Sequence, residues 1–90
     1  MPTVKFTYAL KRFFPNLKET PIPSNNLPEL MEALEKEYPG FRSYILDERG
    51  RLRKHVNIFV DNELIEDREN LSDQVKEDSE VYIMQALSGG

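Results

Sequence analysis

The 90-residue sequence contains no cysteine, no tryptophan and a single histidine, and these absences exclude several kinds of site. Without cysteine there can be no disulfide, no thiolate nucleophile and no cysteine-ligated zinc or iron–sulfur centre. His55 would have to be the base of any serine triad, yet no serine lies in a nucleophile-elbow motif. We therefore interpret His55 as a surface residue of a strand, and we expect neither catalytic residues nor a metal site in this chain.

Long apolar runs and glycine-rich loops are also missing. No segment approaches the ~20 apolar residues of a membrane helix, and the first residues lack the pattern of a signal peptide. A cytoplasmic protein that does not bind membranes is the resulting expectation. Gly40 and Gly50 are isolated, which argues against a phosphate-binding loop. The length fits one small domain with a thin core and little room for an internal substrate pocket.

Positive charge is scarce overall and unevenly distributed. Residues 1–60 carry ten basic and seven acidic side chains, whereas residues 61–90 carry two basic and nine acidic ones, which gives the net charge of −4. The one basic cluster consists of Arg49, Arg51, Arg53 and Lys54. We interpret it as a solvated hairpin arm, since an acidic chain is poorly suited to nucleic acid, and we expect no nucleic-acid binding.

Alternating apolar residues predict the strands. In residues 3–10, Val4, Phe6 and Tyr8 share one face, and residues 17–22 form a second, weaker strand of the same hairpin. Three further strands are expected at residues 52–60, near residues 64–65 and at residues 80–87, with a hairpin turn at residues 61–63. The first and last strands are the strongest candidates for the centre of the sheet.

One helix has a clear beginning and end. Asn26 stands at the cap position, Pro28 in the first turn and Glu29 three residues after the cap, which is a capping-box variant. Apolar residues then recur at helical spacing on one face, and Pro39-Gly40 ends the helix. Residues 41–46 fit either a short helix or an extended connection. In the acidic connection at residues 66–80, Leu71 and Val75 are the expected anchors to the core.

This order of elements predicts an α+β fold, in which a mixed sheet of four to five strands is covered on one face by one amphipathic helix. We expect residues 1–87 to form this single domain and residues 88–90, Ser-Gly-Gly, to form a flexible tail.

The tail is the feature with chemical meaning. Gly89 and Gly90 carry no side chain, so together with Ser88 they fit a narrow channel that bulkier residues would block. A terminal carboxylate is ionised at neutral pH and is a poor electrophile. Activation as a mixed anhydride with AMP would make it reactive toward sulfur, giving a thiocarboxylate, or toward a lysine amine, giving an isopeptide bond. Either reaction leaves the catalysis to partner enzymes.

The sequence resembles the MoaD/ThiS sulfur carriers, which have the ubiquitin-like β-grasp fold. The resemblance rests on Gly89-Gly90 after the last strand, on residues 55–63 (HVNIFVDNE), and on residues 27–34 (LPELMEAL), which match the single helix of the family. It is greatest for the branch of molybdopterin synthase small subunits and CysO-type carriers of cysteine biosynthesis. Gln85, where several relatives have proline, and Leu87-Ser88, where many have Val-Ala, depart from the family pattern.

The resemblance implies a carrier protein rather than an enzyme, or at most the small subunit of a sulfur-transferring enzyme. A MoeB/ThiF-type enzyme would adenylate Gly90 with ATP and magnesium, a sulfur donor enzyme would supply the sulfur, and a MoaE-like or cysteine-synthase-like synthase would accept it. The carrier itself would bind no cofactor. Two alternatives remain: a ubiquitin-like modifier joined to lysines through Gly90, and a β-grasp interaction module that is never activated.

A docking surface follows from the strand period. If Val81 and Ile83 face the helix, Tyr82 and Met84 face outward, as does Phe59 in the neighbouring strand. We expect Phe59, Tyr82 and Met84, with Leu87, to form an exposed apolar patch for a partner enzyme. A covering loop or a register shift of one residue would remove this patch.

Overall fold

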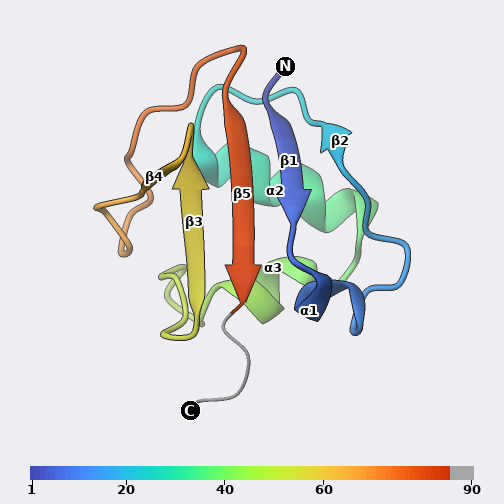
Figure 1. Ribbon diagram of the computed structural model, residues 1–90. Coiled ribbons are helices and arrows are strands. Elements are labelled where there is room, and N and C mark those ends of the chain that lie inside the picture. Colours follow the sequence, from blue (N-terminus) through green and yellow to red (C-terminus); the bar gives the residue numbers. More distant parts are fainter. Residues whose placement is uncertain (86–90) are drawn as a thin grey trace.

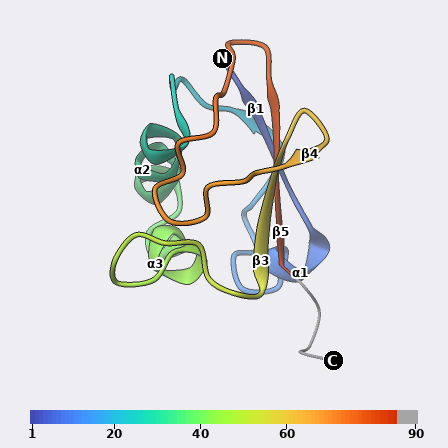
Figure 2. The same ribbon diagram turned by 90° about the vertical axis from the view of Figure 1, so that its left-hand side faces the viewer.

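The structure is a computed structural model that describes residues 1–85, and its centre is a mixed five-stranded sheet (Figure 1). The strands are β1 (Thr3–Phe6), β2 (Thr20–Pro21), β3 (Val56–Val60), β4 (Glu63–Leu64) and β5 (Glu80–Gln85). The helices are α1 (Tyr8–Lys11), α2 (Leu27–Glu37) and α3 (Phe41–Ile45). Helices α2 and α3 lie on the same side of the sheet (Figure 2), which confirms the α+β class.

The strand order in the sheet is β2-β1-β5-β3-β4. β1 runs parallel to β5, and the other neighbours are antiparallel. The predicted central position of the first and last strands is therefore confirmed. β5 is hydrogen-bonded on both edges, so the direction in which it runs is fixed by β1 on one side and β3 on the other.

One core fills the space between the sheet and the helices. Val4, Val81 and Ile83 point inward from the two central strands and are fully buried. The apolar stripe of α2 covers them with side chains that are buried throughout, namely Leu27, Leu30, Met31 and Leu34. Leu71 and Val75 are also buried, which confirms them as the anchors of the long acidic connection.

The start of α2 forms as its sequence predicts. The Asn26 side-chain oxygen accepts a hydrogen bond of 2.8 Å from the Glu29 backbone N–H. In return, the Glu29 carboxylate accepts one of 2.9 Å from the backbone N–H of Asn25, one residue earlier than in the usual capping box. Beyond the far end of the helix, Gly40 has a φ of 94°, a conformation that side chains disfavour and glycine adopts freely.

The predicted first strand is too long. Pairing with β5 stops at Phe6, and the chain then makes the helical turn α1, which leaves Tyr8 79% exposed instead of on the inner face. The physical reason is that Ala9 and Leu10 are both buried. Consecutive residues of a strand point to opposite faces, whereas a helical turn lets both of these side chains reach the core.

Two other predicted strands are also shorter. β3 begins at Val56 rather than Leu52, so His55 precedes the strand instead of lying in it. Leu52 makes an isolated bridge with Leu46 instead. β2 keeps only two residues of the predicted segment 17–22, at an edge of the sheet where Pro21 lacks a donor for further pairing. The ambiguous segment 41–46 contains the helix α3.

The turn between β3 and β4 is a two-residue hairpin, one residue shorter than the predicted turn at residues 61–63, because Glu63 already belongs to β4. Val60 pairs with Glu63, and the two residues between them, Asp61 and Asn62, have φ values of 52° and 70°. Two positive φ values match the twist of antiparallel strands, and Asp and Asn adopt such values more readily than most other residues. This turn sets which side chains of β4 share a face with β3.

Asn26→Ala should destabilise the domain by about 1 kcal/mol, because the Glu29 N–H would lose its partner at the start of α2. Urea unfolding followed by circular dichroism measures this loss. Asn25→Ala is the matched control, since only the backbone of Asn25 takes part in the cap. Equal stability of the two variants would contradict a capping role for the Asn26 side chain.

Candidate functional site at the end of the last strand

The residues with the predicted chemical role, Gly89 and Gly90, lie outside the described residues, as do Leu87 and Ser88. They follow β5, whose last residue is Gln85. A chain of five residues reaches at most roughly 17 Å, so Gly90 lies within that distance of Gln85. Any partner that acts on Gly90 must face this end of the sheet, and the surfaces around Gln85 are the site that the structure describes.

Gln85 is held by three neighbouring segments. Its backbone N–H donates a hydrogen bond of 3.3 Å to the hydroxyl oxygen of Thr7, just before α1. The Tyr44 hydroxyl, from α3, donates one of 3.0 Å to the Gln85 side-chain oxygen. On the other edge, Gln85 is the register partner of Val56 in β3. The position from which the chain continues to Gly90 is therefore fixed from both edges of the strand and from the helical side.

The open face of the sheet carries a row of large side chains across three strands. Phe59 in β3 stands opposite Tyr82 in β5 on one side and opposite Leu64 in β4 on the other. Tyr82 is 38% exposed and Leu64 51% exposed, while Phe59 is partly buried between them. Directly opposed side chains on one face lie close enough to contact each other, so this row is a continuous apolar surface.

Met84 extends the row toward Gln85. It is partly buried and lies on the same face as Tyr82, while Val81 and Ile83 are fully buried on the other face. The predicted orientation of β5 is therefore correct. We refer to Phe59, Leu64, Tyr82 and Met84 as the outer-face patch. Leu64 was missed at the sequence level, because the turn predicted at residues 61–63 includes Glu63, whereas the pairing of Val60 with Glu63 places Leu64 opposite Phe59.

A polar pair borders the outer-face patch on β1. Lys5 stands opposite Tyr82, and its ammonium group lies 3.1 Å from a carboxylate oxygen of Glu80. The hydrogen bond and the charge of Glu80 raise the pKa of Lys5 above its ordinary value. The patch is thus apolar over β5, β3 and β4 and charged along the β1 edge.

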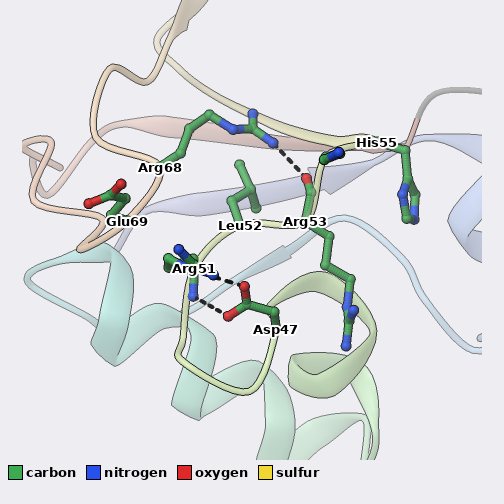
Figure 3. A pocket seen from close by; sticks show the side chains of 8 residues that line it. Asp47, Arg51, Leu52, Arg53, His55, Arg68 and Glu69 are labelled. Carbon is green, nitrogen blue, oxygen red and sulfur yellow. Dashed lines mark hydrogen bonds and ion pairs between the residues drawn. The ribbon is translucent and has the colours of Figure 1, made fainter.

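A second surface feature is the pocket of about 520 Å³ shown in Figure 3. Its basic side chains serve mainly to join segments of the fold. Arg51 forms an ion pair with Asp47, with its Nε atom 3.2 Å from the carboxylate. The backbone N–H groups of Arg51 and Arg49 also donate to that carboxylate and hold the pKa of Asp47 below its ordinary value. Arg53 donates twice to the carbonyl oxygen of Ser43, at 3.1 and 3.0 Å.

Arg68 crosses this pocket from the acidic connection to the start of β3 and the residues before it. Its guanidinium group donates to the backbone oxygens of Arg53 and Val56, at 2.6 and 2.9 Å, and to the side-chain oxygen of Asn57 at 2.9 Å. The predicted basic cluster is therefore only partly a solvated arm. The side chains of Arg51 and Arg53 join segments of the fold, whereas those of Arg49, Lys54 and the neighbouring His55 are exposed.

Two kinds of feature are missing from the residues that the structure describes. Residues 1–85 hold no cluster of three or more His, Asp or Glu side chains that could bind a metal ion. His55 is exposed and lines the pocket with Arg53 and Lys54 rather than with a nucleophile. Within the same residues, no helix has the length and apolar character needed to cross a membrane.

Comparison with protein families gives one match: the model of the ThiS family fits residues 8–90. No curated protein sequence matches the chain significantly. The family match therefore covers almost the whole chain, including Gly89 and Gly90.

Solved structures match over nearly the full length. CysO from Amycolatopsis orientalis, in a complex with BexX, superposes with a TM-score of 0.84 at 20% identity over 100% of both chains. CysO from Mycobacterium tuberculosis gives 0.82 at 24% identity, over 97% of this chain and 100% of that one. Small archaeal modifier protein 1 from Methanosarcina acetivorans gives 0.77 at 22% identity, over 98% and 94%. These similarities confirm the β-grasp fold.

Tyr44→Phe should remove the hydrogen bond to Gln85 and lower the free energy of unfolding by about 1 kcal/mol. Hydrogen exchange followed by NMR should also show faster exchange at the Gln85 amide, because its side chain would no longer be held. Tyr8→Phe, at an exposed position on α1, is the matched control and should change neither quantity. Unchanged exchange at Gln85 in Tyr44→Phe would show that Tyr44 does not anchor the end of β5.

Proposed function

The chain belongs to the ThiS family of ubiquitin-like sulfur carriers and modifiers, and we propose that it carries sulfur on the carboxyl group of Gly90. The observation that supports this most is the family match through residue 90, which ends on Gly89-Gly90. Gly89 and Gly90 follow Gln85, the last residue of the central strand β5, by four and five residues. This short separation is consistent with a tail presented from a rigid base.

The proposed chemistry has two steps, both performed by partners. A MoeB/ThiF-type enzyme binds ATP and magnesium, and a carboxylate oxygen of Gly90 attacks the α-phosphorus while pyrophosphate leaves. Hydrosulfide supplied by a sulfur donor enzyme then attacks the carbonyl carbon and loses its proton, AMP leaves, and a thiocarboxylate remains on Gly90. A MoaE-like or cysteine-synthase-like enzyme takes up this sulfur. This chain contributes the reacting carboxylate and the surfaces that dock it.

A second candidate is a protein modifier, in which a lysine amine attacks the same acyl adenylate. The similarity to small archaeal modifier protein 1 supports this candidate, because that protein is named as a modifier. Both functions need the same activated Gly90, so they differ only in the nucleophile that displaces AMP.

The direct test is accurate mass spectrometry of the C-terminal peptide from protein isolated out of its native cells. A carrier should show sulfur in place of one carboxylate oxygen, localised to Gly90 by fragmentation. Localisation is essential because Met84 lies in the same tryptic peptide, and its oxidation adds nearly the same mass. The variant without Gly89-Gly90 should fold with unchanged stability and lose the modification.

Other outcomes separate the candidates. Lysine conjugates that disappear on deletion of Gly90 would favour the modifier. A bare carboxylate without conjugates would contradict both and leave an interaction module that is never activated.

The outer-face patch is proposed as the main docking surface for the adenylating enzyme, with Leu87 as a further contact. Phe59→Ala and Met84→Glu should each weaken binding at least tenfold, because large apolar residues at the centre of an interface carry much of its binding energy. Isothermal titration calorimetry with the purified enzyme measures this change. Asn25→Glu, at an exposed site before α2 and so on the helical side of the sheet, adds the same charge as Met84→Glu and should bind normally. Normal affinity of both patch variants would rule the patch out.

A further inference from the structure

Two segments without any acidic residue flank the end of β5. Residues 8–18 contain Lys11, Arg12 and Lys18, and residues 49–55 contain Arg49, Arg51, Arg53, Lys54 and His55. In Figure 1, α1 and the loop before β3 lie on either side of the lower end of β5. The sequence places these two segments far apart, and the fold brings them to the same end of the sheet.

Hydrogen bonds fix both segments next to Gln85. Thr7, which accepts from the Gln85 backbone N–H, is the residue before α1. A helix rises about 1.5 Å per residue, so Lys11 lies only about 6 Å further along the axis. On the other edge, Gln85 is the register partner of Val56, which directly follows Lys54-His55. Basic side chains therefore stand on both sides of the strand end.

Seven of these eight side chains are exposed, all except Arg53. The four that lie closest in sequence to Thr7 and Val56, the residues next to Gln85, are Lys11, Arg12, Lys54 and His55. We call them the basic collar. In residues 1–85 the ion pairs are made by the N-terminus, Lys5 and Arg51, and not by the collar. Unlike Arg53 and Arg68, which donate to backbone oxygens, the lysine and arginine side chains of the collar are available to a partner.

The rest of the chain has the opposite charge. Residues 61–80 contain nine acidic and two basic side chains, and they include the start of β5, at the other end of the sheet. Asp61 and Glu80 lie together at the start of β5, so the charge along this strand changes from negative there to positive at Gln85. Such an asymmetry orients a protein as it approaches an oppositely charged surface.

We propose that the basic collar binds an acidic protein surface around the entrance through which a partner enzyme receives Gly90. This inference rests on the proposed function, because it assumes that an enzyme acts on Gly90. The reach of five residues, roughly 17 Å at most, is shorter than the diameter of a typical interface of ~800 Å² per partner. The entrance must therefore lie within the area that one interface centred on Gln85 would cover, and acidic residues on its rim would be drawn to the collar.

A protein surface fits this collar better than a nucleic acid does. Binding to a phosphate backbone generally requires several phosphate contacts, and the nine acidic side chains of residues 61–80 would repel a nucleic acid that extended beyond the collar. The collar also adjoins exposed aromatic surface: Phe13 is 62% exposed, and its ring lies 5.1 Å from that of Tyr44. A small positive surface beside apolar rings matches a protein partner with a local acidic patch.

The test compares two double variants with the adenylating enzyme from the same organism. Arg12→Glu with Lys54→Glu reverses the collar, and Lys36→Glu with Lys76→Glu is the control on α2 and at the far end of the sheet. Each pair replaces two positive charges by two negative ones and so changes the net charge of −4 by the same four units. Stopped-flow measurements give the association rate constant at low and at physiological salt.

The collar variant should associate roughly tenfold more slowly at low salt and lose most of its salt dependence, while the control keeps at least most of the wild-type rate. Equal slowing of both variants would mean that only net charge matters. A wild-type association rate for the collar variant would mean that the collar does not contact the enzyme. Either result overturns the proposal. Circular dichroism checks folding, and Arg12→Gln with Lys54→Gln replaces the collar variant if charge reversal disturbs the fold.

Two further measurements on the same proteins test whether the basic collar binds a nucleic acid or a second copy of this chain instead. Binding of a single-stranded RNA that is lost only in the collar variant, together with unchanged enzyme association, would overturn the proposal in favour of nucleic acid. A wild-type dimer in sedimentation velocity that dissociates in the collar variant, again with unchanged enzyme association, would assign the collar to a second copy of the chain.

A separate measurement distinguishes failure of the proposed function from failure of the collar inference. If wild-type protein at saturating concentration supports no ATP–pyrophosphate exchange by the enzyme, Gly90 is not activated and the proposed function fails. If exchange occurs and the collar variant associates normally, the function stands and the collar inference fails. The expected result is a normal maximal exchange rate for the collar variant at saturation, with the defect confined to association.

Discussion

In the middle of the sheet, β1 and β5 run parallel, with Val4 beside Val81 and Phe6 beside Ile83. Parallel strands cannot be joined by a tight turn, so everything between them must pass over or around the sheet, and α2 makes that crossing over its inner face. The pairing also places the N-terminus beside Glu80, at the end of the sheet opposite Gln85. The end of β5 is thereby separated from the N-terminus by the full length of the sheet.

Because β5 has a partner on each edge, its last residue is one of the best-anchored positions of the backbone. The Thr7 hydroxyl, the pairing with β3 and the Tyr44 hydroxyl all act on Gln85. A carrier must present its reactive end to enzymes with a defined orientation. Anchoring the chain immediately before the tail reduces the number of orientations from which the tail starts, and this lowers the entropy lost on docking.

Patterns that depend on local chemistry predicted the fold well. The Asn26 cap, the Asp61-Asn62 turn and the inward face of β5 each follow from a few neighbouring residues. The errors arose where tertiary contacts override a local pattern. The alternation of Val4, Phe6 and Tyr8 suggests a continuing strand, but the burial of Leu10 next to Ala9 requires a helical turn.

The same distinction applies to the candidate site. Strand alternation placed Phe59, Tyr82 and Met84 on the open face, yet Leu64 could be added only once the pairing of β3 with β4 was known. The basic collar is not visible in the sequence at all, because Arg12 and Lys54 are separated by more than forty residues. Arg12 follows β1 and Lys54 precedes β3, so only the arrangement β1-β5-β3 brings their two segments to the same end of β5.

The outer-face patch and the basic collar suit different demands on a carrier. A protein that must leave one enzyme before it meets the next cannot use a very tight interface, since a nanomolar complex, at about −12 kcal/mol, is released slowly. A small apolar patch provides moderate affinity and governs the dissociation rate. Under the proposed function, charge around the end of β5 would raise the association rate and orient the approach without adding comparable affinity. Dividing the two tasks between two surfaces allows productive encounters to be frequent while each complex remains short-lived.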